Sequence, residues 1–125
     1  MADLNFSNVM IGSAQPEVLG EFYARILDRP ADMKDEAGWY GWRVGDSWFS
    51  VGPHSEVKDQ AKEPSRIILN FEARDVKNEF ERVKATGAKV VKEPYELQGM
   101  WIATFADADG NYFQLMSPWE EPPAS

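Results

Sequence analysis

The sequence contains no cysteine and only one histidine among its 125 residues. Without cysteine there can be no disulfide bond, no thiol nucleophile and no thiolate metal site. The single histidine, His54, cannot by itself supply a centre that needs two imidazole ligands. Glycine-rich phosphate-binding motifs, a nucleophile elbow and a His-Glu-X-X-His motif are absent as well. None of the common catalytic or cofactor signatures is therefore present.

Positive charge and long apolar runs are also scarce. Thirteen lysines and arginines stand against 21 acidic residues, which gives a net charge of −8. Such a surface repels the phosphates of nucleic acids, so we expect no nucleic-acid partner. A cationic or neutral small ligand is tolerated better, although net charge serves solubility first. No apolar run is long enough for a membrane span, and residues 1–12 lack the features of a secretory signal, so we expect a cytoplasmic protein.

The chain does contain a weak internal repeat. Residues 9–22 resemble residues 67–80, and residues 48–51 resemble residues 112–115. Each half has the pattern of a strand, a helix and further strands, so the repeated unit is structural. We predict module 1 at about residues 5–52, a linker at 53–65, module 2 at about 66–117 and a loose tail at 118–125.

Periodicity and turn residues predict the elements of each module. In the first half the pattern predicts a strand at 6–13, a helix from Pro16 to just before Pro30, and a hairpin of strands 39–44 and 47–51 that turns at Gly45-Asp46. In the second half it predicts a strand at 66–71, a helix capped by Asp75 and ended by Gly87, and strands near 89–92, 100–106 and 111–116.

Residues 107–114, Asp-Ala-Asp-Gly-Asn-Tyr-Phe-Gln, resemble the last hairpin of the vicinal-oxygen-chelate superfamily, which includes glyoxalase I, bleomycin-resistance proteins and extradiol dioxygenases. The two repeated units between Asn8 and Met116 resemble the modules of the same superfamily. The resemblance implies an α+β fold in which two βαβββ modules form a curved, cup-shaped mixed sheet with helices on the convex side. It also implies a ligand in the hollow of the cup and a homodimer.

Strand alternation predicts which side chains face that hollow, because successive residues of a strand point to opposite faces. Apolar residues such as Val9, Phe49, Ile67 and Phe113 are assigned to the helix side. The face of Trp101, which shares its side of the strand with Phe105, stays open. The predicted ligand-binding residues are Asn8, Met10, Trp39, Arg43, Trp48, Ser50, Arg66, Ile68, Trp101, Tyr112 and Gln114.

In metal-using members of the superfamily four positions supply ligands, and the resemblance carries them onto Asn8, Ser50, Arg66 or Ile68, and Gln114. At most one of these is a plausible ligand, Gln114, because glutamine is occasionally a ligand in the superfamily, and an amide oxygen binds weakly. We therefore predict no metal, no other cofactor and no catalytic residue of the usual type. Ring cleavage at iron is excluded unless a partner chain supplies ligands. Asp107 and Asp109 are interpreted as turn residues that cap their own backbone.

Three functions remain open. The first is a metal-free protein that binds and sequesters a small planar or cationic organic compound, as in the bleomycin-resistance branch, using aromatic residues such as Trp48 and Tyr112. The second is a divergent isomerase or lyase in which Arg66, Gln114 and Asn8 stabilise an anionic intermediate instead of a metal. The third is an assembly or regulatory subunit whose hollow is filled by its own side chains.

Overall fold

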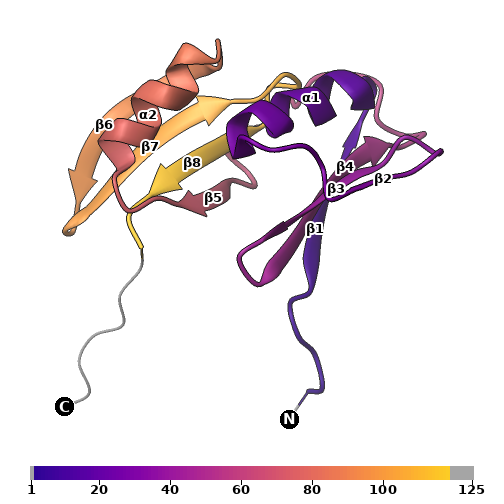
Figure 1. Ribbon diagram of the computed structural model, residues 1–125, viewed down its shortest axis with the longest axis horizontal. Coiled ribbons are helices and arrows are strands. Elements are labelled where there is room, and N and C mark those ends of the chain that lie inside the picture. Colours follow the sequence, from indigo (N-terminus) through magenta and orange to yellow (C-terminus); the bar gives the residue numbers. More distant parts are fainter. Residues whose placement is uncertain (1, 119–125) are drawn as a thin grey trace. The chain divides into compact units, whose positions relative to one another are not determined.

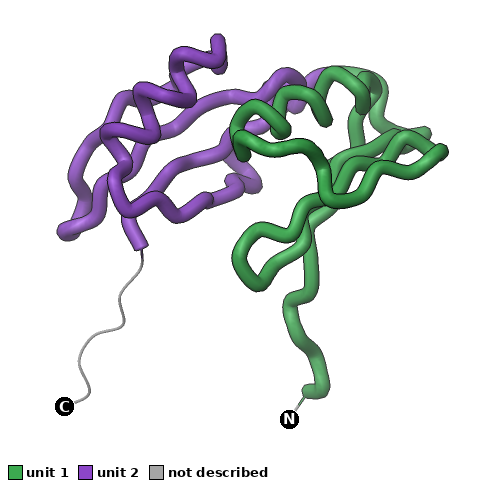
Figure 2. Tube along the Cα trace, in the orientation of Figure 1, with its two compact units in different colours: residues 1–59 green, residues 60–125 purple. Residues whose placement is uncertain are grey.

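The computed structural model describes residues 2–118, and the chain divides into two compact units, residues 1–59 and 60–125 (Figure 2). Each unit has the order strand, helix and three strands, so the predicted α+β fold of two βαβββ modules is confirmed. The first unit contains β1 (Asn8–Ser13), α1 (Pro16–Leu27), β2 (Met33–Lys34), β3 (Tyr40–Val44) and β4 (Ser47–Pro53). The second contains β5 (Leu69–Glu72), α2 (Val76–Ala85), β6 (Lys89–Leu97), β7 (Met100–Ala106) and β8 (Tyr112–Met116) (Figure 1).

The first unit has a four-stranded mixed sheet in the order β1-β4-β3-β2. Strand β1 runs parallel to β4, whereas the other pairs are antiparallel. Strands β3 and β4 form the predicted two-residue hairpin, in which Val44 pairs with Ser47. Gly45 has a φ of 59°, a value that glycine adopts without the steric cost of a Cβ. The short strand β2, which was not predicted, adds the outer edge of this sheet.

Helix α1 covers one face of this sheet. It begins at Pro16, where the missing N–H costs nothing, and it ends at Leu27, before Pro30. Its buried stripe includes Leu19, Phe22, Tyr23 and Ile26. The ring of Tyr23 lies 4.8 Å from that of Phe49 on β4, in an edge-to-face arrangement. The core of the unit therefore lies between α1 and the Phe49 side of the sheet.

The second unit repeats this plan with the order β5-β8-β7-β6. The carboxylate of Asp75 accepts a hydrogen bond of 3.0 Å from the backbone N–H of Asn78, as predicted for a helix cap. On the helix side, the ring centroid of Phe80 on α2 lies 5.2 Å from that of Phe105. The ring of Phe105 in turn stacks on that of Phe113, with 5.5 Å between centroids. These aromatic contacts form the core of the second unit.

Two strands of the second unit differ from their predicted bounds. Strand β6 continues to Leu97, through Pro94, because it is an edge strand and a residue without an N–H is tolerated there. Strand β5 begins at Leu69, three residues later than predicted. Beyond Pro118, the predicted tail lies outside the described residues. Within residues 2–118 no helix is long and apolar enough to cross a membrane.

The turn between β7 and β8 has the conformation expected from its aspartates. Oδ1 of the buried Asp107 accepts hydrogen bonds of 2.9 Å from the backbone N–H groups of Asp109 and Asn111. Gly110 adopts a φ of 83° within this turn. The interpretation of Asp107 as a residue that caps its own turn is therefore confirmed.

Candidate functional site: the ring face of the first unit

Strand pairing places five predicted site residues of the first unit on the sheet face turned away from α1. Asn8 pairs with Trp48, which pairs with Arg43, and Met10 pairs with Ser50. Paired residues of neighbouring strands point to the same side, and this side alternates with the side of Phe49. We call this surface the ring face. Its members are Asn8, Met10, Gly12, Trp39, Gly41, Arg43, Trp48, Ser50, Gly52 and His54.

Two indole rings on this face lie directly over glycines. A methyl group placed on Gly41 would be 2.2 Å from Cζ2 of Trp48, and one placed on Gly52 would be 2.1 Å from Cδ2 of Trp39. Real Cβ atoms do not approach other atoms so closely, so each ring takes the space that a side chain would need. Glycine in a strand often marks such a close approach. The two glycines therefore allow both indoles to lie close against the sheet.

Ser50 lies between the two tryptophan-covered positions. Gly41 is its partner across the hairpin, and Gly52 is two residues further along the same strand and face. The Ser50 side chain is buried, with 5% of its surface exposed, while its other partner, Met10, is 60% exposed. Trp39 and Trp48 are both only partly buried. The centre of the ring face therefore combines accessible aromatic and thioether surface with one buried hydroxyl.

Arg43 brings a positive charge to this face. Its guanidinium carbon lies 5.6 Å from the centroid of the Trp48 ring, within the range of a cation–π contact. Its Nη1 donates a hydrogen bond of 3.4 Å to the backbone carbonyl of Asp46. The side chain is exposed. The ring face therefore has an aromatic surface with a cation at its edge.

Sequence reasoning did not place His54 on this face. Its Cβ would be 2.8 Å from a methyl group placed on Gly12, which pairs with Gly52 beneath the Trp39 ring. The Nδ1 atom accepts a hydrogen bond of 3.2 Å from the backbone N–H of Glu56, so a neutral imidazole carries its proton on Nε2. The one signal in the sequence for this close approach was Gly12, a glycine within a strand.

In the second unit, three predicted site residues lie on the sheet face turned away from α2, namely Ile68, Tyr112 and Gln114. Asn70 pairs with Gln114, and extending this register by one residue places Ile68 beside Tyr112. Ile68, not Arg66, is therefore the residue that corresponds to Asn8. The amide of Gln114 donates a hydrogen bond of 3.0 Å to Oγ1 of Thr104.

Two predicted site residues of the second unit are corrected by the structure. Arg66 precedes β5, and its 71% exposed side chain forms an ion pair with Glu63 on the surface. Arg66 lies three residues before β5, too far for the register to fix its side, and Ile67, two residues before β5, is 75% exposed. Trp101 shares the side of Phe105, as predicted, but this is the helix side, and the Nζ atom of Lys77 lies 3.9 Å from its ring centroid.

The residues at the four ligand positions do not fit a metal ion. Asn8 is exposed and donates to the hydroxyl of Ser7, Ser50 is a hydroxyl, Ile68 is apolar, and Gln114 is engaged with Thr104. None of the four provides the carboxylate or imidazole that divalent ions prefer. In the described part of the chain, no group of three or more histidine, aspartate or glutamate side chains could hold a metal ion.

A separate hollow lies on the helix side of the first unit, at the C-terminal half of α1. Its volume is about 610 Å³, and the ring of Tyr40 lies against α1 at Gly20 on its floor. The rim carries both signs of charge, including Glu21, Arg25 and Lys34. The ring face therefore has more aromatic surface than this hollow, and its charge is of one sign.

Comparisons with known proteins identify a family and a relative of this chain. The family described as a glyoxalase-like domain matches residues 8–116. The uncharacterized protein YetH of Bacillus subtilis (strain 168) is 26% identical over 78 residues, which span 55% of this chain and 65% of YetH, slightly less than two thirds of that protein.

Two solved structures show the same fold over most of the chain. A glyoxalase/bleomycin resistance protein from Albidiferax ferrireducens T118 has a TM-score of 0.72 at 20% identity, over 90% of this chain and 98% of that one. A glyoxalase-related enzyme from Fulvimarina pelagi has a TM-score of 0.74 at 14% identity, over 91% of this chain and 88% of that one. At these identities the likeness concerns the fold alone.

Proposed function

The chain belongs to the glyoxalase-like domain family, and on this premise we propose that it binds a small planar organic compound on the ring face without a metal ion. The observation that carries this proposal is the pair of indole rings, Trp39 and Trp48, held over Gly52 and Gly41, both of which neighbour Ser50. Small-molecule sites combine aromatic surface with a few placed polar groups, and the ring face has this composition.

Planar and cationic ligands were both expected from the sequence, and the local chemistry favours planarity. The net charge of −8 attracts cations from a distance. At Trp48, however, the Arg43 guanidinium carbon lies 5.6 Å from the ring centroid, and its positive charge repels a ligand cation there. A flat ring can still stack on the indoles, because stacking needs aromatic surface and no charge.

The proposal includes a biological role, which is the sequestration of the bound compound. The resemblance to bleomycin-resistance proteins supports binding as the whole function, and the solved structure from Albidiferax ferrireducens T118 is named a glyoxalase/bleomycin resistance protein. The homodimer expected from the resemblance belongs to the same proposal. Light scattering that gives twice the chain mass of 14.2 kDa supports it, and a monomer contradicts it.

The enzymatic alternative has less support. It needs Arg66, Gln114 and Asn8 to stabilise an anionic intermediate. Arg66 instead forms a surface ion pair with Glu63, and the amide N–H of Gln114 is donated to Thr104. A cation held in water stabilises an anion weakly, since water screens the interaction. No observation on the described residues favours this alternative over binding.

Replacing the ring-face tryptophans is expected to weaken ligand binding. Stacking on one aromatic ring contributes about 0.5–1.5 kcal/mol beyond burial. Because about 1.4 kcal/mol corresponds to a tenfold change in affinity, the double variant Trp39→Leu/Trp48→Leu should bind about tenfold or more weakly than the wild type. A ligand is first found by thermal-shift screening of planar aromatic compounds, and the variants are then titrated by calorimetry.

The matched control is Trp101→Leu, which removes a tryptophan from the helix side of the second unit. It should bind the ligand as the wild type does. The proposal is wrong if the folded double variant retains wild-type affinity, or if Trp101→Leu lowers the affinity as much as the ring-face replacement does.

The protein purified without chelator is expected to contain no stoichiometric divalent metal, because the four ligand positions carry Asn8, Ser50, Ile68 and Gln114. Elemental analysis measures the content, and calorimetry with and without EDTA should give the same ligand affinity. One tightly bound nickel, zinc, iron or manganese ion per chain contradicts the metal-free proposal. So does a ligand affinity that EDTA abolishes and an added ion restores.

A further inference from the structure

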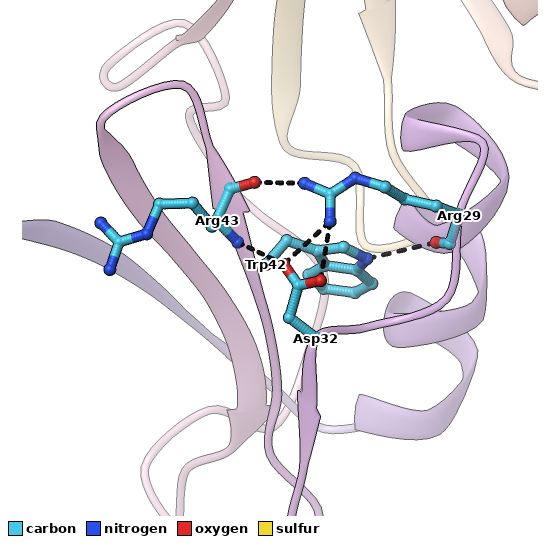
Figure 3. Close-up of polar contacts among 4 residues, drawn as sticks. All are labelled: Arg29, Asp32, Trp42 and Arg43. Carbon is cyan, nitrogen blue, oxygen red and sulfur yellow. Dashed lines mark hydrogen bonds and ion pairs between the residues drawn. The ribbon is translucent and has the colours of Figure 1, made fainter.

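Hydrogen bonds from other residues hold the backbone of Arg43, while its side chain lies on the ring face. The carboxylate of Asp32 accepts a hydrogen bond of 2.7 Å from the backbone N–H of Arg43, and Nη2 of Arg29 donates to the backbone carbonyl of Arg43 (Figure 3). The Arg29 guanidinium also binds both oxygens of Asp32, at 2.9 and 2.8 Å. Both polar backbone groups of Arg43 are thus satisfied by one ion pair.

The charges of this ion pair compensate each other. Hydrogen bonds from the Arg29 side chain, and then from the Arg43 backbone, hold the pKa of the Asp32 carboxyl below its usual value. Asp32 therefore stays ionised and paired with Arg29 at neutral pH. The positive charge of the Arg43 side chain is the last and smallest of the causes that lower the pKa of Asp32.

The Arg43 side chain extends away from the ion pair (Figure 3). Its guanidinium lies over the Trp48 ring and donates one hydrogen bond, to the carbonyl of Asp46. Within residues 2–118, no carboxylate forms an ion pair with it. A guanidinium has five N–H donors in a planar fork that suits two oxygens of one anionic group. Among residues 2–118, the bond to the Asp46 carbonyl uses only one of these donors.

We propose that Arg43 binds the carboxylate of a planar aromatic acid whose ring stacks on the indoles of the ring face. This inference rests on the proposed function and adds the chemical class of the ligand. A protein with a net charge of −8 repels organic anions at long range, so recognition of an acid requires a local cation. Arg43 is the cation that pairing places on this face, beside Trp48.

Three compounds with one ring system test the proposal: 2-naphthoate, the neutral 2-naphthamide and the cationic 2-naphthylmethylamine. The wild type should bind naphthoate most tightly. Arg43→Gln should weaken naphthoate binding by about twofold to fivefold, because an ion pair at an exposed guanidinium contributes about 0.2–1 kcal/mol. The same variant should leave naphthamide binding unchanged, and Arg43→Lys should restore only part of the loss, since an ammonium lacks the planar fork. Calorimetry at fixed ionic strength measures all affinities.

Arg25→Gln is the matched control, because Arg25 also lies near an aromatic ring, 6.0 Å from Phe22, but on α1. It should change none of the three affinities, and equal unfolding temperatures show that the variants are folded. If the naphthyl compounds bind and depend on Trp39 and Trp48, but Arg43→Gln lowers all three equally or none, the inference is wrong and the proposed function stands. A wild-type preference for 2-naphthylmethylamine also overturns the inference. If none of the three binds the wild type, both proposals fail.

Discussion

Replacing Trp42 with alanine is expected to lower the free energy of unfolding by about 3–5 kcal/mol, the cost of truncating a fully buried aromatic residue. Trp42 is 0% exposed. Its ring stacks 6.4 Å from that of Tyr40 and 5.9 Å from that of Phe49. A domain of this size has a total stability of about 5–15 kcal/mol, so this variant loses a large fraction of it.

Trp42 also joins the sheet to the end of α1. Its Nε1 donates a hydrogen bond of 3.3 Å to the backbone carbonyl of Arg29, just after the helix (Figure 3). Trp42→Phe keeps most of the buried ring but removes this bond, and should cost less than Trp42→Ala. Urea denaturation followed by far-UV circular dichroism measures both changes.

The control for the Trp42 prediction is Trp48→Ala, six residues along the same hairpin but on the ring face, where the indole is only partly buried. It should cost clearly less stability than Trp42→Ala. Equal losses would show that the two faces of the sheet contribute alike, which contradicts the assignment of the core to the α1 side.

Strand alternation predicted the ring face of the first unit because the hairpin fixes its own register. A two-residue loop at Gly45-Asp46 leaves one pairing, Val44 with Ser47, and every other pair of β3 and β4 follows from it. Strand β1 then needed only its apolar alternation, which placed Met10 opposite the core. Local turn chemistry and hydrophobic pattern were sufficient here.

The second unit was harder to predict because no tight turn fixes its first strand. Arg66 and Ile67 follow the hydrophobic pattern of a strand, but ladder pairing begins only at Leu69. The face of Trp101 depended on the five residues between β7 and β8, and only the observed pairing of Ile102 with Met116 decides it. Register across a longer loop is a property of the folded sheet.

The directions of the rings on the ring face could not be derived from alternation. Alternation gives the side to which Trp48 points, but not that its indole crosses to the neighbouring strand and covers Gly41. Likewise, His54 follows β4 and turns back over Gly12. Three glycines within strands were the only trace of these rings in the sequence, and they indicate a close approach without naming the group that approaches.

These glycines give the last prediction, which concerns binding and stability together. Gly41→Ala places a methyl group 2.2 Å from Cζ2 of Trp48, and Gly52→Ala places one 2.1 Å from Cδ2 of Trp39. Each indole must shift to make room. Overpacking of this kind costs about 1–3 kcal/mol of folding free energy. A planar ligand that stacks on the two rings should also lose affinity, by about tenfold in the double variant, as for direct removal of the tryptophans.

The control for the two glycine variants is Gly45→Ala, which separates strain from ring displacement. Gly45 has a φ of 59° and no atom within 4 Å of an added methyl group. Alanine there costs roughly 1–2 kcal/mol, because a Cβ disfavours the left-handed conformation, but it moves no ring. Gly45→Ala should therefore lower the unfolding temperature and leave ligand affinity unchanged, while Gly41→Ala and Gly52→Ala lower both. If Gly41→Ala and Gly52→Ala, folded and measured by calorimetry with the same planar compound, bind like Gly45→Ala, the indoles over the glycines are not the surface on which the ligand stacks.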